Sequence, residues 1–135
     1  MIDLHAAAVL ALLNAQTGPP QLNVHDGKVP SGVNPATSPY VLVYFDANQP
    51  DLTFTGRAHT FQLGITCHSV GATARAARMV ADRVRTALLD VAPTVTGRKS
   101  FPIRFDSGIP PQRDEQTGAS VFDEIDIYTL RSVPA

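Results

Sequence analysis

The sequence predicts an α+β fold in which a mostly antiparallel or mixed β-sheet carries two main α-helices packed on it. Two stretches have helical character, at residues 4–16 and 69–90, and the other ordered stretches are rich in β-branched and aromatic residues. Their order along the chain is α-β-β-β-α-β-β, which is typical of an α+β domain. A chain of 135 residues, 44% of them hydrophobic, can bury one core, so we expect a single domain over residues 1–135.

The first helix is expected to start from Asp3 as its N-cap and to end before Gly18-Pro19-Pro20. Its apolar stretch lacks the Lys or Arg that opens a signal peptide. It is also far shorter than the roughly 20 apolar residues of a membrane-spanning helix. We therefore predict a buried helix and no membrane contact. A short strand at residues 21–25 and an Asp26-Gly27 turn follow.

Residues 26–39 form the first of two long loops. Three prolines, Gly32 and several small polar residues exclude a helix or a central strand there. Because prolines lower the entropy cost of ordering a segment against a partner, we expect a semi-rigid arm that touches a neighbouring protein. The β-branched and aromatic run at residues 40–45 then predicts a strand buried on both faces, with Pro39 at its start.

The clearest strand lies at residues 60–69, where apolar and polar residues alternate. One side holds Phe61, Leu63, Ile65 and Cys67, and the other holds Gln62, Gly64, Thr66 and His68. The second helix, residues 69–90, has an apolar stripe at helical spacing and ends before Pro93.

The end of the chain predicts a wide hairpin. One strand is expected at residues 101–105, where Pro102 indicates a sheet edge, and the other at residues 121–132. The second long loop, at residues 106–120, would join them.

No motif for catalysis, phosphate binding or metal binding is present in the sequence. The glycines match neither phosphate-loop spacing, and none of the four histidines stands at metal-ligand spacing. Cys67 and His68 are neighbours, but on a strand they face opposite sides and cannot form a nucleophile–base pair. We expect Cys67 in the core and His68 at a surface or an interface. No catalytic residue, cofactor or metal is predicted.

Three carboxylates stand close together at Asp123, Glu124 and Asp126. On a strand, Glu124 and Asp126 share one face and Asp123 points away. This pattern favours a solvated or partner-facing strand over a metal or acid–base site.

Opposite charges are concentrated in two segments, although the chain has a net charge of only −1 and no basic field for nucleic acid. Residues 75–85 carry a net charge of about +3, and residues 106–126 carry about −5. Two interpretations stay open. The segments form ordinary surface with ion pairs inside the chain, or the basic patch of one copy meets the acidic patch of the next. A contact of the second kind closes into a ring if the rotation allows.

Several pieces of the sequence together resemble the tail terminator, or tail completion, proteins of long-tailed bacteriophages, especially phages of actinobacteria. The pieces are "VHDGKVP", "PYVLVYFD", "TFQLGITCHSVGATARAARMVADRVRTALLD" and "DEIDIYTLRS". They follow the short N-terminal helix in this order and cover most of the chain.

The resemblance implies a structural virion protein and not an enzyme. It implies a hexameric ring on the end of the finished tail tube, which stops polymerisation and offers a docking face to the head-side connector. It also implies that genome DNA passes through the lumen without specific binding, and a place in the tail or neck after assembly in the host cytoplasm.

The charge pattern and the resemblance select three groups of candidate residues. Subunit-interface candidates are Arg75, Arg78, Asp82, Arg85, Arg113, Asp114 and Glu115. Partner-contact candidates in the first loop are Lys28, Val29, Pro30, Val33 and Asn34. Lumen-facing candidates are Asp123, Glu124 and Asp126, whose charge would keep DNA from sticking.

Other functions remain open at the level of sequence. The protein could be another neck component, such as a head-closure or connector-adaptor protein, or a cellular adaptor. It could also be a small-molecule-binding or enzymatic domain, with the loop after Gly27 as a lid over a polar pocket.

Overall fold

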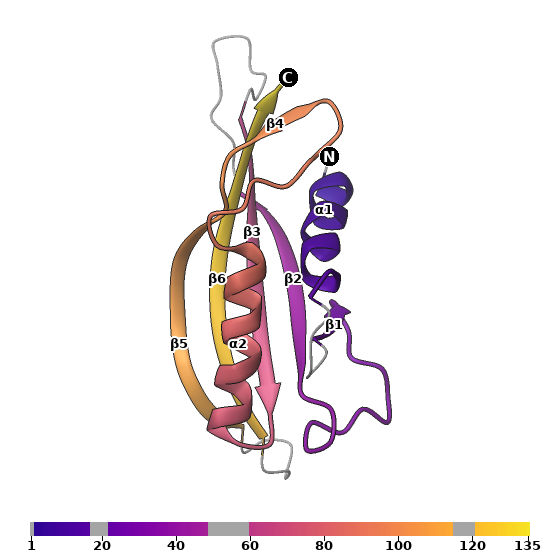
Figure 1. Cartoon of the computed structure of the whole chain (residues 1–135), viewed down its shortest axis with the longest axis vertical. Coiled ribbons are helices and arrows are strands. Elements are labelled where there is room, and N and C mark those ends of the chain that lie inside the picture. Colours follow the sequence, from indigo (N-terminus) through magenta and orange to yellow (C-terminus); the bar gives the residue numbers. More distant parts are fainter. Residues whose placement is uncertain (1, 17–21, 49–59, 115–120) are drawn as a thin grey trace.

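A single mixed sheet, built around its longest strand β6 (Val121–Pro134), forms the centre of the molecule (Figure 1). The computed structural model describes residues 2–16, 22–48, 60–114 and 121–135. The other strands are β1 (Asn23–Asp26), β2 (Tyr40–Asn48), β3 (Phe61–Gly71), β4 (Arg98–Ser100) and β5 (Arg104–Asp114). The helices are α1 (Ile2–Asn14) and α2 (Ala74–Leu88).

The strands are arranged in the order β1-β2-β3-β6, and β6 then pairs on its far side with both β4 and β5. Only β1 and β2 are parallel, and every other pair is antiparallel. The predicted class, a mostly antiparallel or mixed sheet with two main helices, is therefore confirmed, and the short β4 is added to the predicted order.

Both helices cover the same face of the sheet (Figure 1). The strand that alternates most clearly in sequence, β3, points Leu63, Ile65 and Cys67 into this layer, where none of them is exposed. From β2, Val41 and Val43 join them, and the helices contribute buried aliphatic residues. The alternation predicted from the sequence thus selects the face on which the core lies.

The opposite face of the sheet has no helix on it within the described part of the chain (Figure 1). Leu42, Thr66 and Ile127 on this face are half-buried by their neighbours on adjacent strands, whereas Tyr44 and Asp46 are exposed. We call it the open face. Because β2 is buried mainly on its helix side, the prediction that this strand is buried on both faces holds only in part.

α2 starts at Ala74, five residues later than predicted. Ser69 to Gly71 remain in β3 because they continue the antiparallel ladder with β6. Thr73 is the N-cap, and its hydroxyl accepts a hydrogen bond from the N–H of Ala76 at 3.1 Å. A side chain at Gly71 would place its Cβ 2.6 Å from that of Ala76, so glycine lets the strand turn directly into the helix.

The prediction of a second loop at residues 106–120 is wrong for residues 106–114, because β5 runs from Arg104 to Asp114. Pro110 and Pro111 suggested a loop, but β5 is an edge strand, and its ladder with β6 is irregular between Ile109 and Gln112. An edge strand tolerates prolines at such a break. The rest of the predicted loop, residues 115–120, lies outside the described residues.

The strand predicted at residues 101–105 is displaced. β4 ends at Ser100 and β5 begins at Arg104. The connection between them is held by the N–H of Phe101, which donates to Arg131 O, and by that of Ile103, which donates to Val91 O, each at 2.9 Å.

α1 covers residues 2–14, so the predicted N-cap Asp3 lies inside its first turn. A buried polar contact attaches this helix to the sheet. His5 Nε2 lies 2.7 Å from Ser132 Oγ, and Arg98 donates to the same hydroxyl at 3.1 Å. Neither α1 nor α2 is long and apolar enough to cross a membrane.

We predict that Leu63→Ala lowers the free energy of unfolding by about 2–5 kcal/mol, because Leu63 is fully buried and the change leaves a cavity. Leu4→Ala is the matched control, since Leu4 is 52% exposed and its loss should cost less than about 0.5 kcal/mol. Denaturant unfolding of both variants checks this. Equal losses would show that the helix-covered face is not the core.

Candidate functional site

Exposed apolar side chains mark the surfaces on which this molecule can bind another. Along the β5 side lie Phe105 and Ile109, which are 41% and 45% exposed. At the opposite lateral edge of the sheet, Tyr44 on β2 is 44% exposed and Leu4 on α1 is 52% exposed. These side chains are accessible to another protein at both sides of the sheet.

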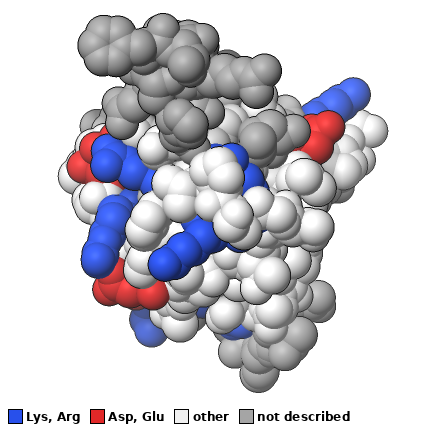
Figure 2. All heavy atoms as spheres, turned by 90° about the horizontal axis from the view of Figure 1, so that it is seen from above, with Lys and Arg blue, Asp and Glu red and all other residues white. Residues whose placement is uncertain are grey.

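Phe105 is held by two aromatic contacts on the helix-covered face. Its ring lies edge-to-face with Tyr128, 5.7 Å between centroids, and the Arg85 guanidinium lies 5.1 Å from its centroid. The basic face of α2 and the edge strand β5 therefore form one continuous surface. Seen from above, Lys and Arg lie on the left half and near the centre of the molecule, with Asp and Glu among them (Figure 2).

A pair of acidic side chains lies beneath this surface. Glu124 and Asp126 share the helix-covered face of β6, as predicted, and Asp126 is only 4% exposed. Burial raises the pKa of both carboxyls, and the Arg85 guanidinium opposes the rise. Gly108 on β5 permits the close approach, because a Cβ there would lie 2.7 Å from Asp126 Oδ1.

The predicted interface residues of α2 lie together and next to their predicted acidic counterparts in the same chain. A groove of about 410 Å³ is lined by Arg75, Arg78, Asp82, Arg85 and Glu124, among others. Part of the charge asymmetry seen in the sequence is thus balanced within one chain. Arg113 is exposed on β5, whereas Glu115 lies outside the described residues, as does the side chain of Asp114.

The three carboxylates predicted to face a lumen do not share a surface. Asp123 points to the open face, as the strand alternation predicted, and its Oδ2 lies 3.0 Å from His68 Nδ1. Tyr44 lies edge-to-face against the same imidazole, 5.6 Å between centroids. Asp126 is buried on the other face and cannot present charge to a channel.

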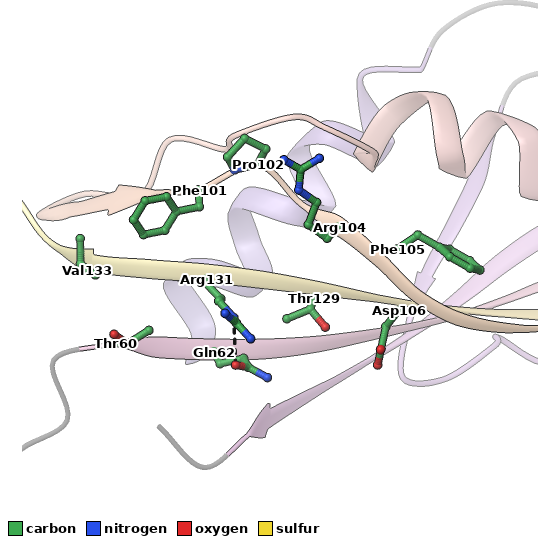
Figure 3. A pocket seen from close by; sticks show the side chains of 10 residues that line it. All are labelled: Thr60, Gln62, Phe101, Pro102, Arg104, Phe105, Asp106, Thr129, Arg131 and Val133. Atoms are coloured by element: carbon green, nitrogen blue, oxygen red, sulfur yellow. Dashed lines mark hydrogen bonds between the residues drawn. The ribbon is translucent and has the colours of Figure 1, made fainter. Parts of the chain in front are cut away.

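A second groove, of about 760 Å³, lies at the upper end of β6 (Figure 3). Phe101 and Arg104 border it from the β4–β5 connection and β5, while Gln62 and Arg131 lie across it. Arg131 donates to Gln62 Oε1 at 3.1 Å. Neither this groove nor the one beside α2 lies beneath the loop after Gly27, where a ligand-binding domain with a lid would need its pocket.

The arm was predicted at residues 26–39, but Asp26 is the last residue of β1. The rest of it has no helix or strand, as expected, and residues 28–39 are ordered by turns. Asn34 organises it: its carbonyl accepts from the N–H groups of Thr37 and Ser38 at 3.1 and 2.8 Å. Asn23 fixes the far end by donating to Pro39 O at 3.1 Å. Among the contact candidates, Lys28, Pro30 and Asn34 are exposed, while Val29 and Val33 are half-buried.

Sequence reasoning missed Phe105, Ile109 and Tyr44 as surface residues. Phe105 and Ile109 fell in or beside a predicted loop, and Tyr44 fell in a strand predicted to be buried on both faces. The sequence carried no clear signal here, because the register of β5 shifts between Phe105 and Ser107 and so breaks the alternation of faces along the strand.

The described residues contain no group of three or more His, Cys, Asp or Glu side chains able to hold a metal ion. Burial raises the pKa of Cys67 to about 12, so its thiol is not a nucleophile at neutral pH.

Comparison with known proteins identifies the family. The family model of Tail completion protein gp17 matches residues 4–123. The chain therefore belongs to that family and is a structural protein of the virion tail, as the resemblance predicted. Membership favours a non-enzymatic role.

Solved structures share the fold. One chain comes from a structure described as the virion of a native gene transfer agent (GTA) particle, with a TM-score of 0.61 and 18% identity, covering 94% of this chain and 92% of that one. Another, known only by a sequence identifier, has a TM-score of 0.70 and 18% identity, covering 98% and 95%. No curated protein sequence matches the chain.

We predict that His68→Gln destabilises the protein in a pH-dependent way. The hydrogen bond to Asp123 raises the pKa of His68 above its usual 6.5. The pair therefore stabilises the fold fully below pH 6.5, and this contribution is lost as the pH rises through the raised pKa. We expect a loss of about 1 kcal/mol or less, measured by denaturant unfolding at several pH values.

Asp123→Asn provides the control for this pair, because it removes the other partner. The double variant should lose no more stability than either single variant at low pH. Additive losses, or a loss that grows as the pH rises, would contradict the assignment.

Proposed function

We propose that the protein caps the end of the phage tail tube as a ring, stops tube polymerisation and provides the docking face for the head-side connector. Family membership carries the proposal, because it assigns the chain to tail completion. The geometry supports it with two separate lateral surfaces, one on β5 and α2 and one on β2 and α1. A head-to-tail contact between two different surfaces is the kind that closes into a ring.

The ring would use the basic face of α2 as part of its subunit interface. Arg78 and Arg85 lie on this face, and Arg85 extends over Phe105 on the exposed edge strand. Glu124 lies beside them and neutralises part of their charge, so the surface is not simply repulsive to a second protein.

The open face of the sheet would line the lumen, with the helices outside. Asp123 then remains a lumen-facing candidate, since it lies on that face. Asp126 is excluded by its burial, and Glu124 by its place beside α2. The arm at residues 28–39 would contact a neighbouring subunit or the tail tube, because its turns are preformed and Lys28, Pro30 and Asn34 are exposed.

The proposal is tested by mixing the purified protein with growing tail tubes and, separately, with DNA-filled heads. We expect it to bind tube ends and arrest elongation, so that tube lengths measured by electron microscopy become limited. Binding to heads alone would instead identify a head-closure or connector-adaptor protein, and no binding to either would leave it without a role in tail completion.

We predict that reversing charge at Arg78 and Arg85 together, with Arg78→Glu and Arg85→Glu, impairs ring formation and tube capping. Like charges would then gather beside Glu124 and Asp82. Native mass spectrometry and tube length measure the effect. Lys99→Glu, an exposed cation on β4, is the control and should assemble normally. If the double variant forms normal rings, the basic face of α2 is not part of the subunit interface.

A further inference from the structure

We propose that β5 of one copy pairs antiparallel with the free part of β2 in the next copy, so that Arg104 meets Asp46 across the contact. The sheets of neighbouring subunits would then continue into one another around the ring. This inference rests on the proposed function and specifies how its subunits join.

One partner surface is the outer edge of β5. This strand pairs only with β6, so its other side has no strand within the described residues. All residues from Arg104 to Pro110 are exposed, including the apolar Phe105 and Ile109. A strand with an unpaired row of N–H and C=O groups is a template for another strand.

The other partner surface is the upper half of β2. β1 pairs with β2 only from Tyr40 to Val43. From Tyr44 to Asn48, β2 has β3 on one side and no described strand on the other. Tyr44, Asp46 and Ala47 are exposed there.

The registers place the two free segments at the same height in the sheet. Asp46 lies opposite Gly64, which lies opposite Thr129, which lies opposite Arg104. Following the ladders in the same way, Phe45 shares its row with Phe105, and Tyr44 shares its row with Ser107. Asp106, between these two residues of β5, has no partner on β6, because the ladder shifts its register there. If the next copy stands in the same orientation without a shift, each row continues into its counterpart.

The row of Arg104 and Asp46 supplies the charge complementarity. Both residues are exposed, and their backbones share one row. Asp46 lies on the open face, whereas the Arg104 guanidinium turns toward the helix side, where it contacts Asp90 (Figure 3). Arg104 contacts Asp90 in its own chain, and its guanidinium has further donors available for a second carboxylate. The next row brings two aromatic rings together on the helix-covered face, a favourable cross-strand pair.

Strand direction and length fit the same arrangement. β2 and β6 run the same way and β5 runs against them, so β5 would be antiparallel to the β2 of a copy in the same orientation. Below the row of Val43 and Gly108, β1 already occupies the edge of β2. Close to that point β5 has Pro110, Pro111 and its irregular pairing, which end a strand contact.

A second copy is a better occupant than an unrelated strand, because the two edges belong to opposite sides of one molecule and match in height, direction and charge. When two copies pair in this way, the first copy keeps its β2 edge free and the second keeps its β5 edge free. The contact is therefore heterologous and repeats until the ring closes.

Charge exchange tests the register. Arg104→Asp and Asp46→Arg should each weaken subunit association about tenfold or more, and the combined variant should recover it. The fraction of ring is measured by native mass spectrometry and on capped tail tubes. Asp90→Asn is the control, because it removes the neighbour of Arg104 within the chain and should leave the ring intact.

Cross-linking tests the same contact independently of charge. Tyr44→Cys combined with Ser107→Cys places two thiols in one row, at a separation that a disulfide can span. Mild oxidation of the assembled ring should give a ladder of linked subunits on a non-reducing gel. Ser107→Cys with Thr86→Cys is the control and should give none, since Thr86 is exposed on α2 away from that row. Cys67 is buried and should not interfere.

The outcomes separate this inference from the proposed function. Rings or tube caps that form normally in both single charge variants, without a cross-linked ladder, would overturn the strand pairing and leave the capping role standing. If the unchanged protein forms no ring and caps no tube, the proposed function fails, and the strand pairing fails with it.

Discussion

The antiparallel ladder between β3 and β6 is the constraint on which the rest of the structure depends. It joins Phe61–Gly71 to residues 122–132 in continuous register. Because successive side chains on a strand point to opposite faces, this one register decides which residues form the core and which reach the open face. It sends Ile65 and Tyr128 under the helices and leaves His68 beside Asp123 on the open face. A slip of one residue would exchange the two faces.

Several ionisable groups are buried along this ladder, and their burial favours the neutral forms of these side chains. Burial raises the pKa of both Cys67 and Tyr128 to about 12, and Asp126 lies among them with a raised pKa. Asp126 Oδ2 and the Tyr128 hydroxyl are buried without a hydrogen bond in standard geometry among the described residues. Arg85 lies close enough to attract both. The attraction of Arg85 for these groups links α2 to β6.

The packing of α2 and β5 on β6 decides which of the charged residues lie near each other. In sequence, the basic helix and the acidic late segment suggested contact between copies. In the structure, Arg85 and Glu124 already lie near each other within one chain. Arg104 and Asp46 stand at the two sides of the sheet, and the sequence did not connect them; Arg104 already has Asp90 beside it in the same chain. A net charge near zero thus says little about how charge is distributed over the surface, and it is the distribution that gives orientation and specificity to protein association.

The sequence by itself determined the α+β class, the core face of β3, the place of Cys67 and the unlike faces of Asp123 and Glu124, because alternation along a strand is a local property. It could not determine that residues 104–114 form an edge strand, since prolines read as a loop wherever the neighbouring strand is unknown. Nor could it place Asp46 and Arg104 in one row. Their shared row depends on the registers of three ladders, β2–β3, β3–β6 and β6–β5, and only the tertiary structure fixes these registers.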